Sequence, residues 1–204
     1  MNLINKDTKI YCSFSSNPGN NGCVYFNNKF QQSGVNAIYK SFYSDNIEKS
    51  VQAVKSLGIA GFAVSMPFKV EVLKYVDDVD ISVKEIGAAN TIINLDGYLK
   101  AYNTDWLGVK NYFNTLPEHI SILGNGGFSK AVQYACRTLQ IEYTVYTREH
   151  WHKVAQLTGV VFNATPTDVV VQGNLIDGRP FTTQGKIIAE LQAYEQYKLY
   201  THGY

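Results

Sequence analysis

The segment SILGNGGFSKAVQYACRTL (121–139) constrains the fold of this chain more than any other. It has the pattern of a strand, a glycine-rich turn and a helix in direct succession. A second strand (142–146), a short helix (149–157) and a third strand (160–163) are expected after it. Strands and helices that alternate in this order predict a parallel sheet with right-handed crossovers, and therefore an α/β fold.

The chain before this segment predicts strands, helices and one hairpin. Residues 12–22, CSFSSNPGNNG, are rich in Ser, Asn, Gly and Pro and are typical of a loop. Asp96-Gly97 separates two expected strands, 91–95 and 98–102, and suits the two-residue turn of a type I′ hairpin. The other elements expected in this part are strands over 37–42 and 61–66 and helices over 23–33, 46–57 and 69–76.

The end of the chain leaves little room for a second βαβαβ unit. A connecting helix is expected over 107–114 and a last amphipathic helix over 185–201. Between Pro166 and that last helix lies GNLIDGRPF (173–181), which reads as turns. The sequence therefore predicts one complete βαβαβ unit and the loss of most of a second.

Composition excludes several classes of function. With 18 basic and 17 acidic residues the net charge is +1, so no nucleic-acid or anionic-membrane partner is expected. The three cysteines form no CxxC pair, and His150 and His152 would not share a helix face, so neither a disulfide framework nor a metal site is indicated. The N-terminus has no apolar signal core, and no apolar run approaches about 18 residues. We expect a cytoplasmic protein in a reducing compartment.

The glycine-rich turn GNGGF (124–128) is a candidate phosphate site. Glycines let the backbone approach a phosphate closely, and the helix that follows presents its positive N-terminus. The second strand ends at Thr147-Arg148, where the ribose of a dinucleotide would lie, and an arginine there suits a 2′-phosphate. An ordinary strand-to-helix turn and a solvated surface arginine stay open as alternatives.

Three polar motifs stand at the ends of expected strands, where open α/β sheets build their sites. SMPFK (65–69) puts a lysine after a strand, AANT (88–91) puts an amide before one, and NTD (103–105) puts a carboxylate after another. A lysine and an aspartate brought together could share proton transfer. A surface lysine and a helix-capping aspartate are the alternative.

Taken together, these motifs resemble the shikimate dehydrogenase family from about residue 18 to residue 201. The resemblance is carried by VSMPFK, IGAANTIIN, AYNTD, GNGGFSKA, FNATP and LQAYEQYKLYT, in that order. The PxNxG loop and the exact SMPFK motif are most similar to those of the shikimate dehydrogenase-like branch. The resemblance implies a two-lobed α/β fold. It comprises a substrate-binding domain (1–106), a shortened Rossmann-like NADP-binding domain (107–182) and a C-terminal helix that returns to the substrate lobe (183–204).

The resemblance also implies a role for individual residues. Lys69 and Asp105 would form the catalytic pair at the reacting hydroxyl of the substrate. The residues expected to bind the ring hydroxyls are Ser65, Asn90 and Gln192. Those expected to bind NADP are Gly124, Gly126 and Gly127 at the pyrophosphate and Arg148 at the 2′-phosphate.

One position departs from the family pattern. Typical members hold the substrate carboxylate with a Ser-x-Ser pair near the N-terminus, and the matching positions here are Asn20 and Gly22. Ser13 and Ser15 have the right mutual spacing but would require an insertion before the first helix. We expect Asn20 to bind the carboxylate.

The function implied is reversible, NADP-dependent hydride transfer between shikimate and 3-dehydroshikimate. A weakly active or inactive paralogue that binds a shikimate-like ligand is one alternative. An enzyme that acts on quinate is another. Because the nucleotide-binding domain is short, we expect weak NADP binding and slow turnover beside near-normal binding of the small-molecule substrate. A homodimer is left open.

Overall fold

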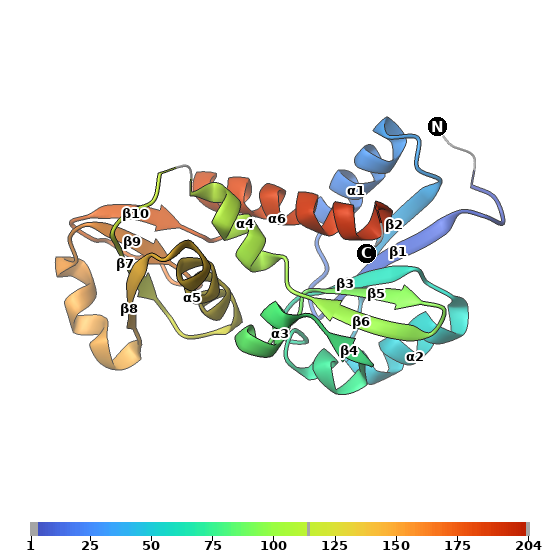
Figure 1. Ribbon diagram of the computed structural model, residues 1–204, viewed down its shortest axis with the longest axis horizontal. Coiled ribbons are helices and arrows are strands. Elements are labelled where there is room, and N and C mark those ends of the chain that lie inside the picture. Colours follow the sequence, from blue (N-terminus) through green and yellow to red (C-terminus); the bar gives the residue numbers. More distant parts are fainter. Residues whose placement is uncertain (1–3, 114, 203–204) are drawn as a thin grey trace. The chain divides into compact units, whose positions relative to one another are not determined.

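The computed structural model describes residues 4–113 and 115–202, which form two compact units. The first unit runs to Thr104 and includes the chain again from Glu195, and the second spans Asp105–Tyr194 (Figure 1). Parts of three predicted segments lie outside the described residues. They are residues 1–3 of the N-terminus that is expected to lack a signal, residue 114 of the helix predicted over 107–114, and residues 203–204 of the predicted closing segment. Within the described ranges, no helix is long and apolar enough to cross a membrane.

The first unit is built on a six-stranded sheet in the order β2-β1-β3-β5-β6-β4. Strands β1, β2 and β3 run parallel, whereas β5 is antiparallel to β3 and β6 is antiparallel to β5. Short β4 pairs in parallel with β6. Their bounds are Lys9–Ser15 (β1), Ala37–Tyr43 (β2), Gly61–Val64 (β3), Asp78–Val79 (β4), Thr91–Leu95 (β5) and Tyr98–Tyr102 (β6).

The hairpin predicted around Asp96-Gly97 is confirmed. Asp96 has a φ of 51° and Gly97 a φ of 96°. Positive φ at both central residues is what a type I′ turn needs, and it matches the right-handed twist of the strands on either side. The turn fixes the register of β5 against β6, with Thr91 opposite Tyr102.

Strand β1 was not predicted, and the expectation of a loop over residues 12–22 is wrong for its first four residues. The strand lies between β2 and β3, and it pairs with β2 along its whole length and with β3 from Tyr11 to Phe14. Its last four residues, CSFS, include small polar side chains of the kind that is common in loops. The backbone N–H and C=O groups of β1 form hydrogen bonds with two strands that are distant in the sequence, and composition alone does not reveal such partners.

Helices cover both faces of this sheet. The predicted helices appear as α1 (Asn21–Gln32) and α2 (Ile47–Leu57), while the segment predicted over 69–76 is the 3₁₀ helix η1 (Glu71–Tyr75). Helix α3 (Ile81–Ile86) was not predicted. One face of the sheet buries Cys12, Phe14 and Phe62 against the apolar side of α2.

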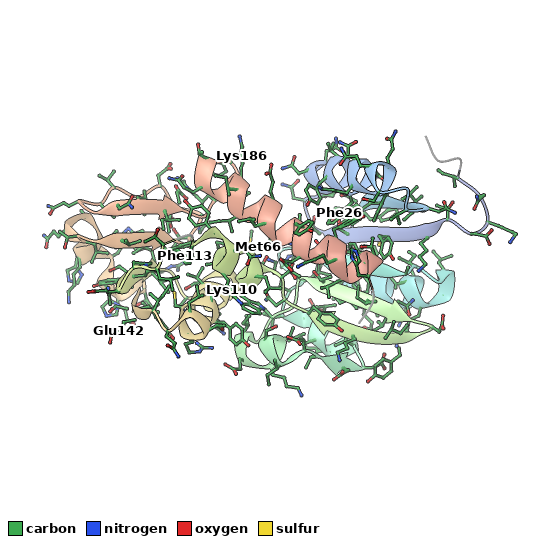
Figure 2. The ribbon with its side chains drawn as sticks, turned by 45° about the horizontal axis from the view of Figure 1, so that its top comes forward. Phe26, Met66, Lys110, Phe113, Glu142 and Lys186 are labelled. Atoms are coloured by element: carbon green, nitrogen blue, oxygen red, sulfur yellow. The ribbon has the colours of Figure 1, made fainter. Side chains whose placement is uncertain are left out.

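The opposite face holds an aromatic cluster that joins α1 and the end of α6 to the sheet. The ring centroids of Tyr11 of β1 and Tyr200 lie 4.3 Å apart. Those of Phe26, which Figure 2 labels on α1, and Tyr39 of β2 lie 4.5 Å apart. The Tyr11 hydroxyl donates to the carbonyl of Tyr200 at 2.6 Å. Burial raises the pKa of Tyr11 to about 12, so this donor keeps its proton. The predicted return of the closing helix to the substrate lobe is confirmed by these contacts.

The second unit is built on a four-stranded parallel sheet in the order β10-β9-β7-β8. The strands are β7 (His119–Leu123), β8 (Glu142–Tyr146), β9 (Val160–Asn163) and β10 (Asn174–Asp177). Three strands and their parallel pairing were predicted. Strand β9 lies on the other side of β7 from β8, so the strand order reverses between β7 and β9.

Strand β10 corrects the expectation that GNLIDGRPF forms only turns. It is four residues long and lies between Gly173 and Gly178, whose turn character hides it in the sequence. Its backbone pairs in parallel with β9 and so forms part of the sheet. The described part of the unit therefore has four strands, with strands on both sides of the reversal, and the lobe is reduced as predicted.

Helices also cover both faces of the second sheet. Helices α4 (Asp105–Tyr112), α5 (Gly127–Leu139) and α6 (Thr183–Thr201) contribute Val109, Val132 and Ile188 to one core. The 3₁₀ helix η2 (Arg148–Gln156) packs on the opposite face. This arrangement leaves the carboxyl ends of the strands as an edge at which turns and helix N-termini meet.

Candidate active site

Polar residues of the first unit gather at one edge of its sheet. The carboxyl ends of β1, β2 and β3 meet there because the three strands are parallel. Strand β5 begins and β6 ends at the same edge, since Thr91 pairs with Ala63 of β3 and with Tyr102 of β6. The motifs SMPFK, AANT and NTD, which are far apart in the sequence, are therefore neighbours.

Backbone hydrogen bonds fix the SMPFK turn against the AANT segment. The amide of Phe68 donates to the Ser65 carbonyl at 2.8 Å, and the buried Phe68 ring anchors the turn. The amide of Ala89 donates to the Lys69 carbonyl at 2.8 Å, and that of Val64 donates to the Asn90 carbonyl at 3.0 Å. Ser65, Lys69 and Asn90 are thus held at the same edge.

Asn90 is a brace between the start of β5 and the end of β6. Its side chain is buried, its Nδ2 donates to the Thr104 hydroxyl at 3.0 Å, and its Oδ1 accepts from the Thr104 amide at 2.9 Å. The Thr91 hydroxyl also donates to Oδ1, at 2.9 Å. Asn90 thereby orients Thr104, the residue that leads into Asp105. Its contact with a ring hydroxyl stays a prediction.

The first loop offers two sets of groups for a substrate carboxylate. Asn20 is exposed at the N-terminus of α1, and its carbonyl accepts from the Val24 amide at 3.0 Å, while its side chain makes no capping bond to that helix. Ser15 ends β1 at the site edge, whereas the Ser13 hydroxyl donates to that of Ser41 at 3.1 Å. The alternation of apolar and polar residues in KIYCSFS was the signal that could have revealed this strand.

In the second unit, Asp105 and Gln192 lie on adjacent helices. Asp105 is buried as the first residue of α4, and Gly108 follows one turn later. A Cβ atom added to Gly108 would lie 2.7 Å from the Ile188 carbonyl oxygen and 2.8 Å from Cβ of Gln192, both on α6. Glycine at this position lets the two helix backbones touch, which brings the predicted catalytic carboxylate and the predicted substrate-binding amide onto neighbouring turns.

The glycine-rich turn has the shape that a phosphate group needs. Gly124 has a φ of 98°, and a Cβ atom there would lie 2.9 Å from Cγ2 of Thr165, so only glycine fits. The Ser129 hydroxyl closes the turn by donating to the Gly124 carbonyl at 2.7 Å. Gly126 caps α5 without a side chain, and a Cβ atom there would meet nothing within 4 Å. The first turn of α5, beginning at Gly127, is open to an anion.

The ends of the neighbouring strands complete the edge that is predicted to bind a nucleotide. The Gly124 amide donates to the Tyr146 carbonyl at 2.8 Å, and the Ala164 amide donates to that of Leu123 at 3.1 Å. The carboxyl ends of β8, β7 and β9 therefore meet at the point where the strand order reverses, which is where open α/β sheets bind nucleotides. Arg148 is exposed just beyond β8. The donor set fits a dinucleotide with a 2′-phosphate.

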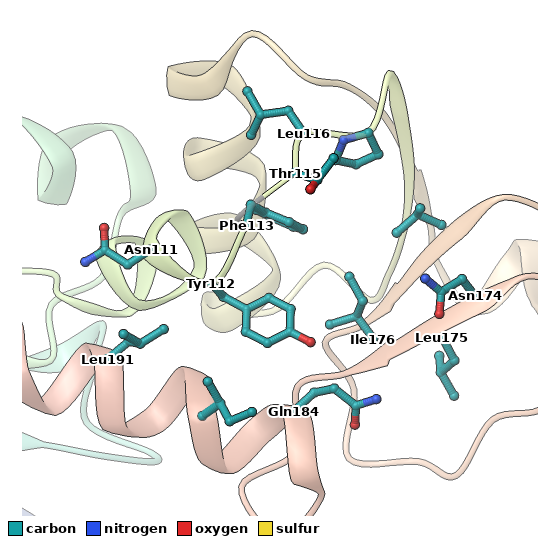
Figure 3. Close-up of a pocket in the computed structure, with 13 residues that line it drawn as sticks. Asn111, Tyr112, Phe113, Thr115, Leu116, Asn174, Leu175, Ile176, Gln184 and Leu191 are labelled. Atoms are coloured by element: carbon teal, nitrogen blue, oxygen red, sulfur yellow. The ribbon is translucent and has the colours of Figure 1, made fainter.

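A cavity of about 640 Å³ in the second unit lies elsewhere (Figure 3). Its wall includes Tyr112, the last residue of α4, and Phe113, which follows it, together with Val160 and Asn174, the first residues of β9 and β10. It therefore opens at the amino ends of the strands, and none of the predicted site residues is among its described lining residues.

Comparison with known proteins identifies the family. Residues 22–92 match the model of the shikimate dehydrogenase substrate binding domain. A shikimate dehydrogenase-like protein of Haemophilus influenzae is 37% identical over 151 residues, which cover 72% of this chain and 56% of that protein. The chain belongs to the shikimate dehydrogenase family, as the sequence predicts. A shikimate dehydrogenase (NADP(+)) of Pyrococcus furiosus is 36% identical over 65% of this chain and 51% of its own length. The chain thus spans about half the length of these curated relatives of the family.

Solved structures of the family share the fold. A shikimate 5-dehydrogenase-like protein superposes with a TM-score of 0.84 at 28% identity, over 98% of this chain and 94% of that chain. The Thermus thermophilus shikimate 5-dehydrogenase, solved with NADP(H) and shikimate, has a TM-score of 0.81 at 19% identity, over 95% of this chain and 94% of that one. The predicted two-lobed α/β architecture with a Rossmann-like lobe is confirmed.

Gly108→Ala tests the contact between α4 and α6. The added methyl group must push the two backbones apart, and overpacking of this kind costs about 1–3 kcal/mol. We expect the free energy of unfolding, measured by urea denaturation, to fall by that amount. Gly19→Ala is the control, because an added Cβ there meets nothing within 4 Å. Equal stability of parent and Gly108→Ala would contradict the close approach.

Proposed function

We propose that this protein is an NADP-dependent oxidoreductase that interconverts shikimate and 3-dehydroshikimate. The observation that carries the proposal is the gathering of Ser65, Lys69 and Asn90 at one sheet edge, fixed by hydrogen bonds from Ala89 to Lys69 and from Val64 to Asn90. Membership of the shikimate dehydrogenase family supports the choice of substrate. The open N-terminus of α5 and the exposed Arg148 support the choice of cofactor.

Each residue has a defined part in the proposed reaction. NADP, when bound, supplies the acceptor for the hydride that leaves the carbon of the substrate. Lys69 and Asp105 receive and return the proton of the same hydroxyl group, as general acid–base catalysis requires. Ser65, Asn90 and Gln192 orient the ring through its hydroxyl groups. Asn20 binds the carboxylate, and Ser13 with Ser15 is the alternative.

Four groups would hold the cofactor. Gly124, Gly126 and Gly127 present the turn and the first amides of α5 to the pyrophosphate, because no side chain occupies that helix terminus. Arg148 binds the 2′-phosphate through parallel hydrogen bonds from its guanidinium group. Strand β10 weakens the main reason for expecting poor NADP binding, since it gives the nicotinamide side of the sheet a strand that the sequence did not predict.

Two other functions remain as alternatives. A paralogue that only binds a shikimate-like ligand is favoured by the short second unit, and a quinate dehydrogenase would use the same residues. Absorbance of NADPH, followed with shikimate and with quinate in separate assays, distinguishes the substrates. Calorimetric titration with shikimate alone and with NADP alone identifies a protein that binds but does not react. Absence of both turnover and shikimate binding would reject the proposal.

Three features other than the reaction are also proposed: the domain division, the location in the cell and the oligomeric state. The division into domains 1–106, 107–182 and 183–204, the cytoplasmic location and a homodimer stay predictions. Size-exclusion chromatography with light scattering measures the oligomeric state directly.

Lys69→Ala tests the proton-transfer role. Removal of the amine should lower kcat by about a hundredfold or more, because a positioned acid–base group contributes a factor of that order. The fold should persist, since the turn is held by backbone hydrogen bonds and by the Phe68 ring. Steady-state kinetics and thermal unfolding are measured together. Lys74→Ala, on η1, is the matched control, and unchanged turnover in Lys69→Ala would remove this residue from the mechanism.

Arg148→Ala tests cofactor selection. The parent should prefer NADP to NAD, and the variant should lose that preference, because the guanidinium group pairs with the 2′-phosphate only in NADP. Dissociation constants for both cofactors are measured by calorimetry. Lys153→Ala, on the same 3₁₀ helix, controls for the loss of a positive charge. If the parent binds NADP and NAD equally well, Arg148 does not select the cofactor.

A further inference from the structure

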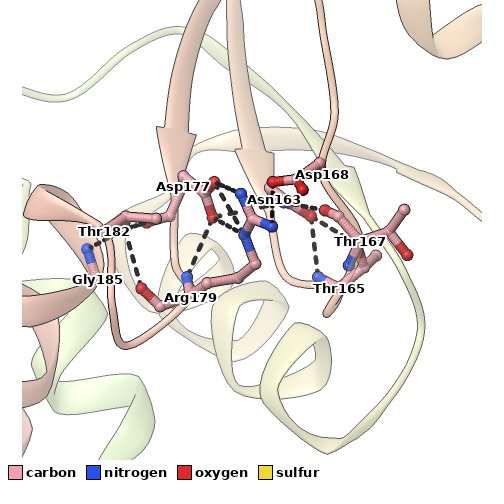
Figure 4. A network of polar contacts seen from close by, with 8 residues as sticks. All are labelled: Asn163, Thr165, Thr167, Asp168, Asp177, Arg179, Thr182 and Gly185. Carbon is pink, nitrogen blue, oxygen red and sulfur yellow. Dashed lines mark hydrogen bonds and ion pairs between the residues drawn. The ribbon is translucent and has the colours of Figure 1, made fainter.

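A network of polar side chains joins the ends of β9 and β10 (Figure 4). At its centre, the Arg179 guanidinium group forms a double hydrogen bond with the Asp177 carboxylate. Nε lies 3.0 Å from Oδ1, and NH2 lies 2.6 Å from Oδ2. Both side chains are nine-tenths buried, since 11% of Arg179 and 10% of Asp177 is exposed. This geometry is the strong, planar form of an arginine–carboxylate pair.

The same arginine also holds the loop that follows β9. Its NH1 group lies 2.5 Å from Oδ1 of Asp168, a residue whose side chain is 93% exposed. Nδ2 of Asn163, at the end of β9, donates to the Thr167 carbonyl at 2.9 Å and to Asp177 at 3.4 Å. Arg179 therefore links the loop at Asp168 to the end of β10 at Asp177, and Asn163 makes a second link from the end of β9 to the same carboxylate.

Asn163 carries the network to the glycine turn. Its Oδ1 accepts from the Thr165 amide at 3.0 Å and from the Thr165 hydroxyl at 2.7 Å. The methyl group of Thr165 then lies against Gly124, where an added Cβ would approach it to 2.9 Å. The side of the glycine turn that faces β9 is thus formed by a loop whose conformation depends on Asn163, Asp177 and Arg179.

Charge balance in the network favours a fixed structure. Burial alone would raise the pKa of Asp177, but hydrogen bonds and the positive charge from Arg179 outweigh it and hold that pKa below its ordinary value. Asp177 is therefore ionised at neutral pH and stays paired with Arg179. The Thr182 hydroxyl also donates to the Asp177 carbonyl at 2.6 Å, which fixes the turn leading into α6.

The strand order places this network on the nicotinamide side of a bound dinucleotide. The pyrophosphate fits the turn after β7, and the 2′-phosphate fits Arg148 after β8, so the adenosine half lies over β8. The other half must then extend over the ends of β9 and β10, which neighbour β7 on the opposite side. Those ends carry Asn163 and Asp177.

We infer that Arg179 is a positioning residue that builds the wall for the nicotinamide half of NADP, by holding the loop after β9 against the end of β10. The inference rests on the proposed use of NADP. It assigns to residues 163–179 the role that a longer second half of the domain would otherwise serve. Arg179 acts through the loop, since its guanidinium group is already bound to Asp177 and Asp168.

Binding of two ligands distinguishes a role of Arg179 in positioning the nicotinamide half from a role in the general stability of the unit. One is NADP, and the other is adenosine 2′,5′-bisphosphate, which has the adenosine half and the 2′-phosphate but no nicotinamide. Arg179→Ala should weaken NADP binding by about tenfold or more, because the loop no longer aligns with the ring, and should leave the bisphosphate affinity unchanged. Arg148→Ala should weaken both ligands. Arg137→Ala, an exposed arginine in the last turn of α5, should change neither.

Hydrogen exchange of the full chain without ligand gives an independent measurement. In Arg179→Ala the amides of Thr165 and Thr167 should exchange faster than in the parent, while those of α5 should not change. Equal losses for both ligands, or no change in either NADP affinity or exchange, would overturn the inference. A parent protein that binds neither ligand would instead reject the proposed cofactor, and the inference with it, before any variant is made.

Discussion

Hydrogen bonding between parallel strands is the constraint on which the candidate site depends. Parallel strands end at a common edge, so residues that follow different strands become neighbours even when they are far apart in the sequence. In the first unit this edge gathers Ser65, Lys69 and Asn90, and in the second it gathers the glycine turn with the ends of β8, β9 and β10. The side chains at each edge then need only local bonds, such as those between Asn90 and Thr104, to be oriented.

Elements with a local signal could be predicted from the sequence. The hairpin at Asp96-Gly97 needs two positive φ angles, and the residues that tolerate them are visible in the sequence. The turn at Gly124 is visible for the same reason. Strand β10 was missed because its existence depends on its partner β9, whereas β1, which pairs with β2 and β3, left only the weak alternation in KIYCSFS as a local signal. Local composition carries no record of such pairing.

In the candidate site, too, the residues with a local sequence signal could be predicted, and those whose role depends on strand pairing could not. The motifs that supply Lys69, Asn90 and Arg148 stand out as polar groups at strand ends, so sequence reasoning could propose them. The brace that Asn90 provides for Thr104 could not be inferred, since it depends on the antiparallel pairing of β5 with β6. The network around Arg179 was missed entirely. GNLIDGRPF resembles turns, and nothing in that segment indicates that its arginine pairs with Asp177 in a nearly buried position.

The second unit shows why strand order matters more than strand number for a nucleotide site. A dinucleotide needs a glycine turn at the reversal of strand order and a strand end on each side of it. Strand β8 supplies one side and β9 the other, so four strands contain the whole arrangement. Behind the loop after β9, Val169 and Val171 pack against Leu123 and Val161. A buried ion pair can hold such a loop as well, but only when its lone pairs and protons are satisfied, because an unpaired charge there would be strongly destabilising. Arg179 meets this condition through Asp177 and Asp168, which is why a short, glycine-flanked segment can hold a loop in one conformation.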